Sequence, residues 1–263
     1  MNSKFNVEND SKWILPHELK KQEIAEYSSS LANLDLKSDF GSYKALRYGK
    51  NKTMIETHNS CGKRSIFLAE HLSRFINRYI KKPMVIADMG CGAGFIANDL
   101  HNIIKNCEIF AFDVSEDAIA YGKEKFPKVH FEAKVIAPDT EFGILFNIIY
   151  AHEFYPFTRT NSFEFQKSYI DNFLKQIDFD NNGLLIISLK HTKKCLLNNY
   201  DEFIKNYQGE YQIERFIIPS FKIYNLFKLY NLSSLITVII NIILNRKNSY
   251  IIIVRRLHKI DKI

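Results

Sequence analysis

Glycines recur at every second position after an acid in the first half of the chain. The acid is Asp88, and the glycines that follow it are Gly90, Gly92 and Gly94. Glycine has no Cβ and adopts positive φ, so such a turn bends sharply and lets a ligand approach the backbone. The third glycine comes one position too early for the G-x-G-x-x-G turn that cradles a dinucleotide pyrophosphate. The spacing therefore predicts a site for a nucleoside ligand without a pyrophosphate.

A second acid stands at the end of the next apolar segment. Asp113 closes the apolar run 109–112 and lies 23 residues after Gly90. Ligands of an open parallel sheet bind beyond the carboxyl ends of the central strands. If both apolar runs are neighbouring strands, both acids border the same crevice. Asp113 is then placed to accept hydrogen bonds from the hydroxyl groups of a ribose.

Apolar segments alternate with helical patterns on both sides of the glycine turn, which is typical of β-α-β units and a parallel sheet. A helical stripe runs from Ile66 to Ile80, and further helices are expected after Gly94, after Ser115 and over 163–177. The expected strands are 84–87, 108–113, 129–135, 146–152, 183–189, 211–218 and 249–255. The fold class is therefore α/β.

An uncharged apolar stretch, 232–244, interrupts the pattern before the last expected strand. It is too short to span a bilayer. Within a helical insert of about 220–247 it would form a lid, pack against a second copy in a homodimer, or rest in a membrane interface. We expect two parts: an N-terminal arm and helical cap over 1–82, and a cofactor-binding domain over 83–263 that contains the insert.

With these elements in place, the chain resembles the class I S-adenosylmethionine-dependent methyltransferases over roughly residues 60–256. The resemblance rests on Asp88, the three glycines, Asp113 and the order of the strands. It implies a Rossmann-like sheet of seven mostly parallel strands with helices on both faces. It also implies a last strand that is antiparallel, an N-terminal helical cap, a helical insert before the last strand, and S-adenosyl-L-methionine as the cofactor.

The resemblance also implies roles for particular residues. The glycine turn would support the methionine and sugar parts of the cofactor, Asp113 its ribose, and Val114 its adenine. Ala151 would line the region of the methyl group. The expected cofactor contacts are Asp88, Gly90, Cys91, Gly92, Gly94, Asp113, Val114, Lys134, Val135, Ala151 and, from the cap, Arg47.

Two positions depart from the family pattern. An acid near the adenine amino group often follows the third strand, whereas this chain has Lys134 and Val135 there. The fourth strand often opens with Phe-Asp, whereas this chain has Phe146 and Asn147. The two departures weaken the prediction of individual cofactor contacts at these positions, but they do not change the prediction of the cofactor itself.

The segment 152–159 follows the fourth strand, where acceptor and methyl group would meet in this family. His152 titrates near neutrality and is a candidate base. Glu153 would orient that base, take the proton itself or neutralise an amine. Alternatively, His152 contacts the cofactor or caps a helix, and Glu153 is an acid in a first helical turn. The candidate acceptor contacts are Tyr155, Arg159, Tyr43 and His58.

Charge is unevenly distributed along this chain of 263 residues, whose net charge is +7. Ten Lys or Arg face two acids over 40–82, and six face one acid over 245–263. These runs form either solvated faces or a basic rim that attracts an anionic substrate, a nucleic acid or a membrane surface. The C-terminal part, 220–263, is a candidate for peripheral contact with an anionic membrane.

Four cysteines without paired spacing favour reduced thiols in a cytoplasmic protein, and no metal site is expected. No signal peptide is apparent at the start of the sequence. Three functions fit: O-methylation of a small molecule or saccharide, methylation of nucleic acid, or a non-catalytic methyltransferase-like binding protein. The fourth strand lacks an N-P-P-Y sequence and no RNA-binding module is evident, so nucleic acid is disfavoured. Both acids of the site are intact, which disfavours the non-catalytic protein.

Overall fold

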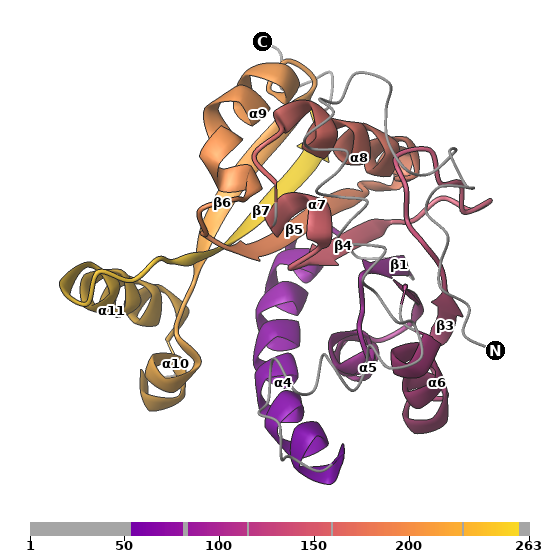
Figure 1. Cartoon of the computed structure of the whole chain (residues 1–263), viewed down its shortest axis with the longest axis horizontal. Coiled ribbons are helices and arrows are strands. Elements are labelled where there is room, and N and C mark those ends of the chain that lie inside the picture. The colour runs from indigo at the N-terminus through magenta and orange to yellow at the C-terminus, as the bar shows by residue number, and fades with distance from the viewer. Residues whose placement is uncertain (1–53, 81–83, 115, 159, 228, 258–263) are drawn as a thin grey trace.

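One sheet forms the centre of the computed structural model, which describes residues 54–80, 84–114, 116–158, 160–227 and 229–257 (Figure 1). Its strands are β1 (Met84–Met89), β2 (Cys107–Asp113), β3 (His130–Ala133), β4 (Ile148–His152), β5 (Leu184–Lys190), β6 (Tyr211–Ile218) and β7 (Ser249–Arg256). Across these described residues the sheet has seven strands in the order β3-β2-β1-β4-β5-β7-β6. Strand β7 is antiparallel to both its neighbours, and the other pairings are parallel. The predicted fold class, including the antiparallel last strand, is confirmed.

Helices cover both faces of the sheet (Figure 1). They are α4 (Met54–Tyr79), α5 (Phe95–Ile103), α6 (Glu116–Lys125), α7 (Tyr155–Thr158), α8 (Phe163–Lys175), α9 (Tyr200–Tyr207), α10 (Phe221–Phe227) and α11 (Tyr230–Ile243). Two short 3-10 helices, η2 (Phe179–Asn181) and η3 (Leu196–Asn199), flank β5. Helices α4, α5 and α6 pack on one face, and α7, α8 and α9 pack on the other.

The central strands are buried on both faces, as their unbroken apolar runs predict. In β1, Ile86 joins the core under α4 and α5, whereas Ala87 joins the core under α8. In β5, Ile186 likewise lies in the core under α4 and α5, and Ile187 lies in the core under α8. All four side chains are fully buried. The sheet is therefore a rigid platform whose carboxyl edge carries the loops of the site.

Helix α4 belongs to the core through the stripe expected from the sequence. Its buried residues include Phe67, Leu72 and Ile76. The fully buried His71 lies on the same helix, and its Nδ1–H donates to the Phe67 carbonyl over 2.7 Å. The predicted cap over 1–82 falls largely on residues outside those described, so the boundary at 82 stays a prediction.

Helices α10 and α11 form the insert expected between the last two strands. They project from one end of the sheet, at the left of Figure 1. Among the described residues, no helix is long and apolar enough to cross a membrane.

Candidate functional site

The glycine turn lies between β1 and α5, and its backbone is tied to the neighbouring strand β2. The N–H groups of Gly90 and Cys91 both donate to the Phe112 carbonyl, over 2.8 and 2.9 Å. Gly94 adopts a φ of 76°, and a Cβ at this position would lie 2.2 Å from the Phe131 ring. Only glycine satisfies both the left-handed backbone and this close packing. The turn is thus held in one conformation by packing that its sequence requires.

The two acids predicted from the sequence meet at this turn. Asp113 accepts a hydrogen bond from the Gly92 N–H over 2.7 Å. Asp88 is only 2 % exposed, and its Oδ2 atom has no hydrogen-bond partner among the described residues. Burial of the Asp88 carboxyl, to which the charge of Asp113 adds, raises its pKa to about 8. A buried carboxyl oxygen without a donor is unusual and indicates a place where a ligand donates.

Cys91, between the two acids, is not an activated nucleophile. Its thiol lies 3.3 Å from the Gly92 carbonyl. Burial and the charges of Asp113 and Asp88 raise the pKa of the thiol well above its ordinary value. The neutral thiol is much less reactive than a thiolate. Cys91 can therefore line the cofactor site without taking part in chemistry.

The side expected to hold adenine lies where β2 and β3 end. The Lys134 N–H donates to the Asp113 carbonyl over 2.9 Å, which fixes the two segments together. The Lys134 ammonium lies 5.0 Å from the centre of the Phe142 ring and 3.6 Å from a Glu132 oxygen. Val114 and Val135 are half-buried. Lys134 is thus engaged by an aromatic ring and a carboxylate where the family often has an acid.

The end of β4 brings the candidate catalytic residues beside the glycine turn. Ala151 is fully buried and pairs with Met89, the last residue of β1. His152 follows, with its Nδ1 atom 3.1 Å from the hydroxyl of the buried Ser188 on β5. A Cβ added to Gly90 would lie 3.0 Å from the Phe154 ring, so this segment rests directly on the turn.

Glu153 is bonded to the backbone of β5. Its Oε1 accepts from the Lys190 N–H over 2.7 Å, and its own N–H donates to the Ser188 carbonyl over 2.8 Å. Its φ is 51°, in the left-handed region that residues other than glycine seldom occupy. These bonds fasten the end of β4 to the end of β5. Its catalytic role stays a prediction.

The predicted acceptor contacts are only partly within the described residues. Tyr155 begins α7 and is half-buried against the core that contains α8. His58 lies in α4, but its side chain is outside what the structure describes. Tyr43, Arg47 and Arg159 also lie outside the described residues, so their roles stay predictions.

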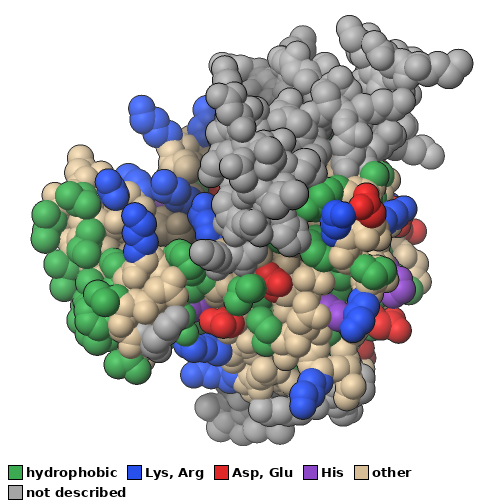
Figure 2. Space-filling view, turned by 90° about the horizontal axis from the view of Figure 1, so that it is seen from below, with side chains coloured by type: hydrophobic (Ala, Val, Ile, Leu, Met, Phe, Trp, Pro, Cys, Tyr) green, Lys and Arg blue, Asp and Glu red, His purple; other side chains and the backbone are tan. Residues whose placement is uncertain are grey.

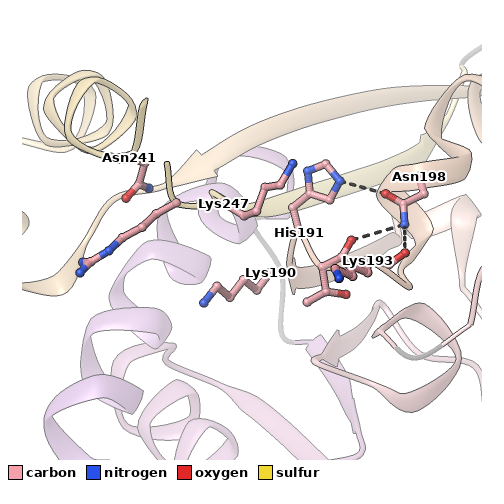
Figure 3. Close-up of a pocket in the computed structure, with 8 residues that line it drawn as sticks. Lys190, His191, Lys193, Asn198, Asn241 and Lys247 are labelled. Carbon is pink, nitrogen blue, oxygen red and sulfur yellow. Dashed lines mark hydrogen bonds between the residues drawn. The ribbon is translucent and has the colours of Figure 1, made fainter. Parts of the chain in front are cut away.

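A cationic cavity that the sequence did not predict opens where β5 ends (Figure 3). It has a volume of about 780 Å³ and is lined by Lys190, His191, Thr192, Lys193, Asn198, Asn241, Arg246 and Lys247. Figure 3 shows that Lys190 and Lys193 come from the end of β5 and the segment after it, whereas Asn241 comes from α11. The available signal was the basic segment 190–194 directly after the fifth apolar run. Arg246 and Lys247 precede β7, and the pairing of β5 with β7 brings them close to segment 190–194.

This cationic cavity lies at the same edge of the sheet as the glycine turn. The registers align Met89 of β1 with Ala151 of β4 and Ile187 of β5. Neighbouring strands are about 4.8 Å apart, so β5 runs about 10 Å from β1. Lys190, three residues beyond Ile187, lies at the same carboxyl edge as Gly90. The arrangement suits a cofactor over β1 and a second ligand over β5.

The residues at the turn fit S-adenosylmethionine, the cofactor that the family resemblance implies. The Asp88 oxygen without a donor suits the cofactor's ammonium, and the Asp113 carboxyl lies at the end of β2, where a ribose would be bound. Asp88, Asp113 and the turn would therefore hold the cofactor.

A family model and solved structures both relate this chain to methyltransferases. A family model described as "Methyltransferase domain" matches residues 80–214. The plantazolicin methyltransferase BpumL in complex with SAH has a similar structure, with 14 % identity, a TM-score of 0.55 and coverage of 83 % of this chain and 94 % of that chain. A TehB-like SAM-dependent methyltransferase from Corynebacterium glutamicum has 14 % identity, a TM-score of 0.51 and coverage of 84 % and 100 %. A search of curated proteins gives no match.

Proposed function

Since the chain belongs to the methyltransferase domain family and is an S-adenosylmethionine-dependent methyltransferase, we propose that it methylates an oxygen of a small molecule or saccharide that carries an anionic group. The observation that carries this proposal is the cationic cavity at the end of β5, at the same carboxyl edge of the sheet as the glycine turn. Its volume of about 780 Å³ is within the range of small-molecule sites.

The charges of the cavity call for an anion. Four cationic side chains line it, and no acidic residue is among the lining residues. In the described part of the chain, no carboxylate lies within 4.0 Å of Lys190, Arg246 or Lys247. Arg and Lys bind phosphate and carboxylate groups through charge-assisted hydrogen bonds. An acceptor with such a group would neutralise the cavity and be anchored at the end of β5.

The residues between cavity and turn supply what the transfer needs. S-adenosylmethionine, when bound, supplies an electrophilic methyl group that an oxygen displaces in line, so the position of that oxygen governs much of the rate. His152 would take the proton from the acceptor hydroxyl, and Ser188 holds its Nδ1 atom at 3.1 Å. Glu153 positions the loop through the Lys190 N–H.

The proposal is tested by assaying methyl transfer from labelled S-adenosylmethionine to paired acceptors. The pairs are sugars and hydroxy acids with and without a phosphate or carboxylate group. We expect transfer only to the anionic member of a pair, with the label bound to oxygen in the ¹³C NMR spectrum. Equal transfer to neutral analogues, or transfer to total RNA instead, contradicts the proposal.

The cavity itself is tested with the double variant Lys190→Gln/Lys247→Gln. Loss of two charge-assisted contacts raises the KM for the anionic acceptor by about 100-fold. The Kd for S-adenosylmethionine stays unchanged, because neither side chain belongs to the glycine turn. The matched control is Lys123→Gln, an exposed lysine on α6, which leaves both constants unchanged. An unaltered KM in the double variant refutes the cavity as the acceptor site.

A further inference from the structure

Helix α11 turns one stripe of polar side chains toward the protein. Ser233 and Thr237, one helical turn apart, are 0 % and 4 % exposed. The Thr237 hydroxyl donates to the Ser233 carbonyl over 2.7 Å and accepts from the Ser220 N–H over 2.9 Å. One turn further, Asn241 donates to the Asn248 side chain over 2.7 Å. A polar stripe thus fastens the helix to the chain before α10 and to the segment before β7.

The opposite face of α11 is aliphatic and exposed. Leu235, Ile242 and Ile243 are 58 %, 72 % and 74 % exposed. The other exposed apolar residues of the insert are Leu226, Phe227, Leu229, Leu232, Ile239, Ile240 and Leu244. A surface helix of a globular protein normally has the reverse arrangement, with its apolar stripe toward the core. Large contiguous apolar surface marks a site of contact with a membrane or another protein.

Cationic residues lie beside this apolar face. Figure 2 shows hydrophobic side chains gathered at the end of the molecule that carries α11, with Lys and Arg side chains beside them. Lys222 begins this border on α10, and Arg246 and Lys247 follow the end of α11; all three are exposed. The sequence contains no Asp or Glu between Glu214 and Asp261. The face therefore combines apolar side chains with one sign of charge.

We propose that the outward face of α11 docks on an anionic lipid bilayer, with the helix lying in the plane of the interface. An amphipathic helix of this kind buries its apolar face at the boundary between headgroups and acyl chains. The cationic border would meet the negative surface potential of the membrane, where each Lys or Arg adds to binding. The 14 residues of α11 are too few to span the bilayer.

A second copy of the chain fits this face less well. A twofold interface brings the same patch of both subunits together. The two cationic borders would then meet each other without an acid from the insert to pair with. Like charges across an interface oppose association, whereas anionic lipid provides the complement. This proposal does not depend on the identity of the methyl acceptor.

The test is co-sedimentation of the full chain with vesicles of phosphatidylcholine and phosphatidylglycerol, compared with vesicles of phosphatidylcholine alone. We expect binding to the anionic vesicles that weakens with salt. The variant Ile242→Ser/Ile243→Ser reduces the partition coefficient at least about 10-fold. The matched control, Ile144→Ser/Leu145→Ser, changes two exposed aliphatic residues outside the insert and leaves binding unchanged. Unaltered affinity for S-adenosylmethionine verifies that each variant is folded.

A second readout keeps the proposal testable if the serine variant does not fold. In Leu235→Trp, the emission of the added tryptophan shifts to shorter wavelength on anionic vesicles, whereas in Leu145→Trp it does not. Absence of binding to anionic vesicles overturns the proposal. So does equal binding to both kinds of vesicle. A concentration-dependent dimer that Ile242→Ser/Ile243→Ser abolishes, without vesicle binding, assigns the face to a second copy instead.

Discussion

The ionised carboxyl of Asp88 should destabilise the folded protein, yet it should strengthen binding of the cofactor. It is 2 % exposed, and burial raises the pKa of its carboxyl to about 8, against 3.8 for an ordinary aspartate. In the ligand-free protein the group is therefore protonated at neutral pH. The unfolded chain is ionised from about pH 4 upward, so between about pH 4 and 8 the folded state holds one more proton at this site. Stability must then fall as the pH rises through this window.

The variant Asp88→Asn has the shape of the protonated acid and no titration. Each pKa unit corresponds to 1.36 kcal/mol, so the free energy of unfolding of the natural protein should fall by about 4 kcal/mol relative to the variant between pH 5 and pH 8. The difference between the two proteins matters here, because all other titrating groups are shared and cancel.

Urea denaturation of the ligand-free proteins at pH 5, 6.5 and 8, followed by circular dichroism, measures this difference. The control is Asp139→Asn, an exposed aspartate whose substitution gives the same small effect at each pH. A stability difference for Asp88→Asn that does not change with pH refutes the reasoning, since it would mean that Asp88 keeps one charge state throughout. The same variant should bind S-adenosylmethionine more weakly, because the carboxylate that faces the cofactor's ammonium is lost.

Two further predictions concern Asp113 and the buried His71. Asp113→Ala removes about two charge-assisted hydrogen bonds to the ribose, which are worth about 3 kcal/mol. The Kd for S-adenosylmethionine, measured by calorimetry, should therefore rise about 100-fold. A Kd within threefold of the natural value contradicts the assignment of Asp113 to the ribose. Burial lowers the pKa of His71 to about 4, so the folded state binds fewer protons than the unfolded state between about pH 4 and 6.5, and stability falls as the pH drops through this window. Relative to His71→Gln, the natural protein should lose about 3 kcal/mol of unfolding free energy from pH 7 to pH 4 in urea denaturation, and an equal loss in both proteins argues against the lowered pKa.

The sheet and the cofactor turn could be predicted because their signals are local. Strand β6 has the bounds expected from its alternation, Tyr211–Ile218. Asp88, the glycines and Asp113 each end or follow an apolar run, and the parallel registers bring them together. The fourth strand begins later than expected, at Ile148, because Asn147 accepts from the Val85 N–H through its side chain over 2.8 Å. A side-chain bond of this kind leaves no trace in hydropathy.

The acceptor side could not be predicted in the same way. Lys190 and Lys247 are 57 positions apart, and only the antiparallel pairing of β5 with β7 brings their segments together. Glu153 was predicted to act on the base or the acceptor, or to stand in a first helical turn, and the sequence did not indicate that it accepts from the Lys190 N–H. Its positive φ results from how the loop closes over β5, which residue type alone does not specify.

The orientation of α11 had a signal that hydropathy conceals. The average hydropathy of α11 is so apolar that either face of the helix could be buried. However, Ser233, Thr237 and Asn241 repeat at every fourth position and so form one polar stripe. Hydrogen bonds to Ser220 and Asn248 determine that this stripe faces inward. Polar spacing within an apolar helix can therefore identify the inward face.

Helix α11 takes part in both the acceptor cavity and the membrane-docking face, but through different residues. Asn241 lines the cationic cavity, whereas Ile242 and Ile243 point away from the protein. Arg246 and Lys247 line the cavity and belong to a segment without acids, and such a segment attracts an anion whether that anion is dissolved or belongs to a lipid. The cationic residues would therefore contribute both to acceptor binding and to membrane docking, whereas the exposed aliphatic face would contribute only to membrane docking. Substitution of Ile242 and Ile243 should therefore remove vesicle binding while the KM for a soluble anionic acceptor stays the same, and substitution of Lys190 should do the reverse.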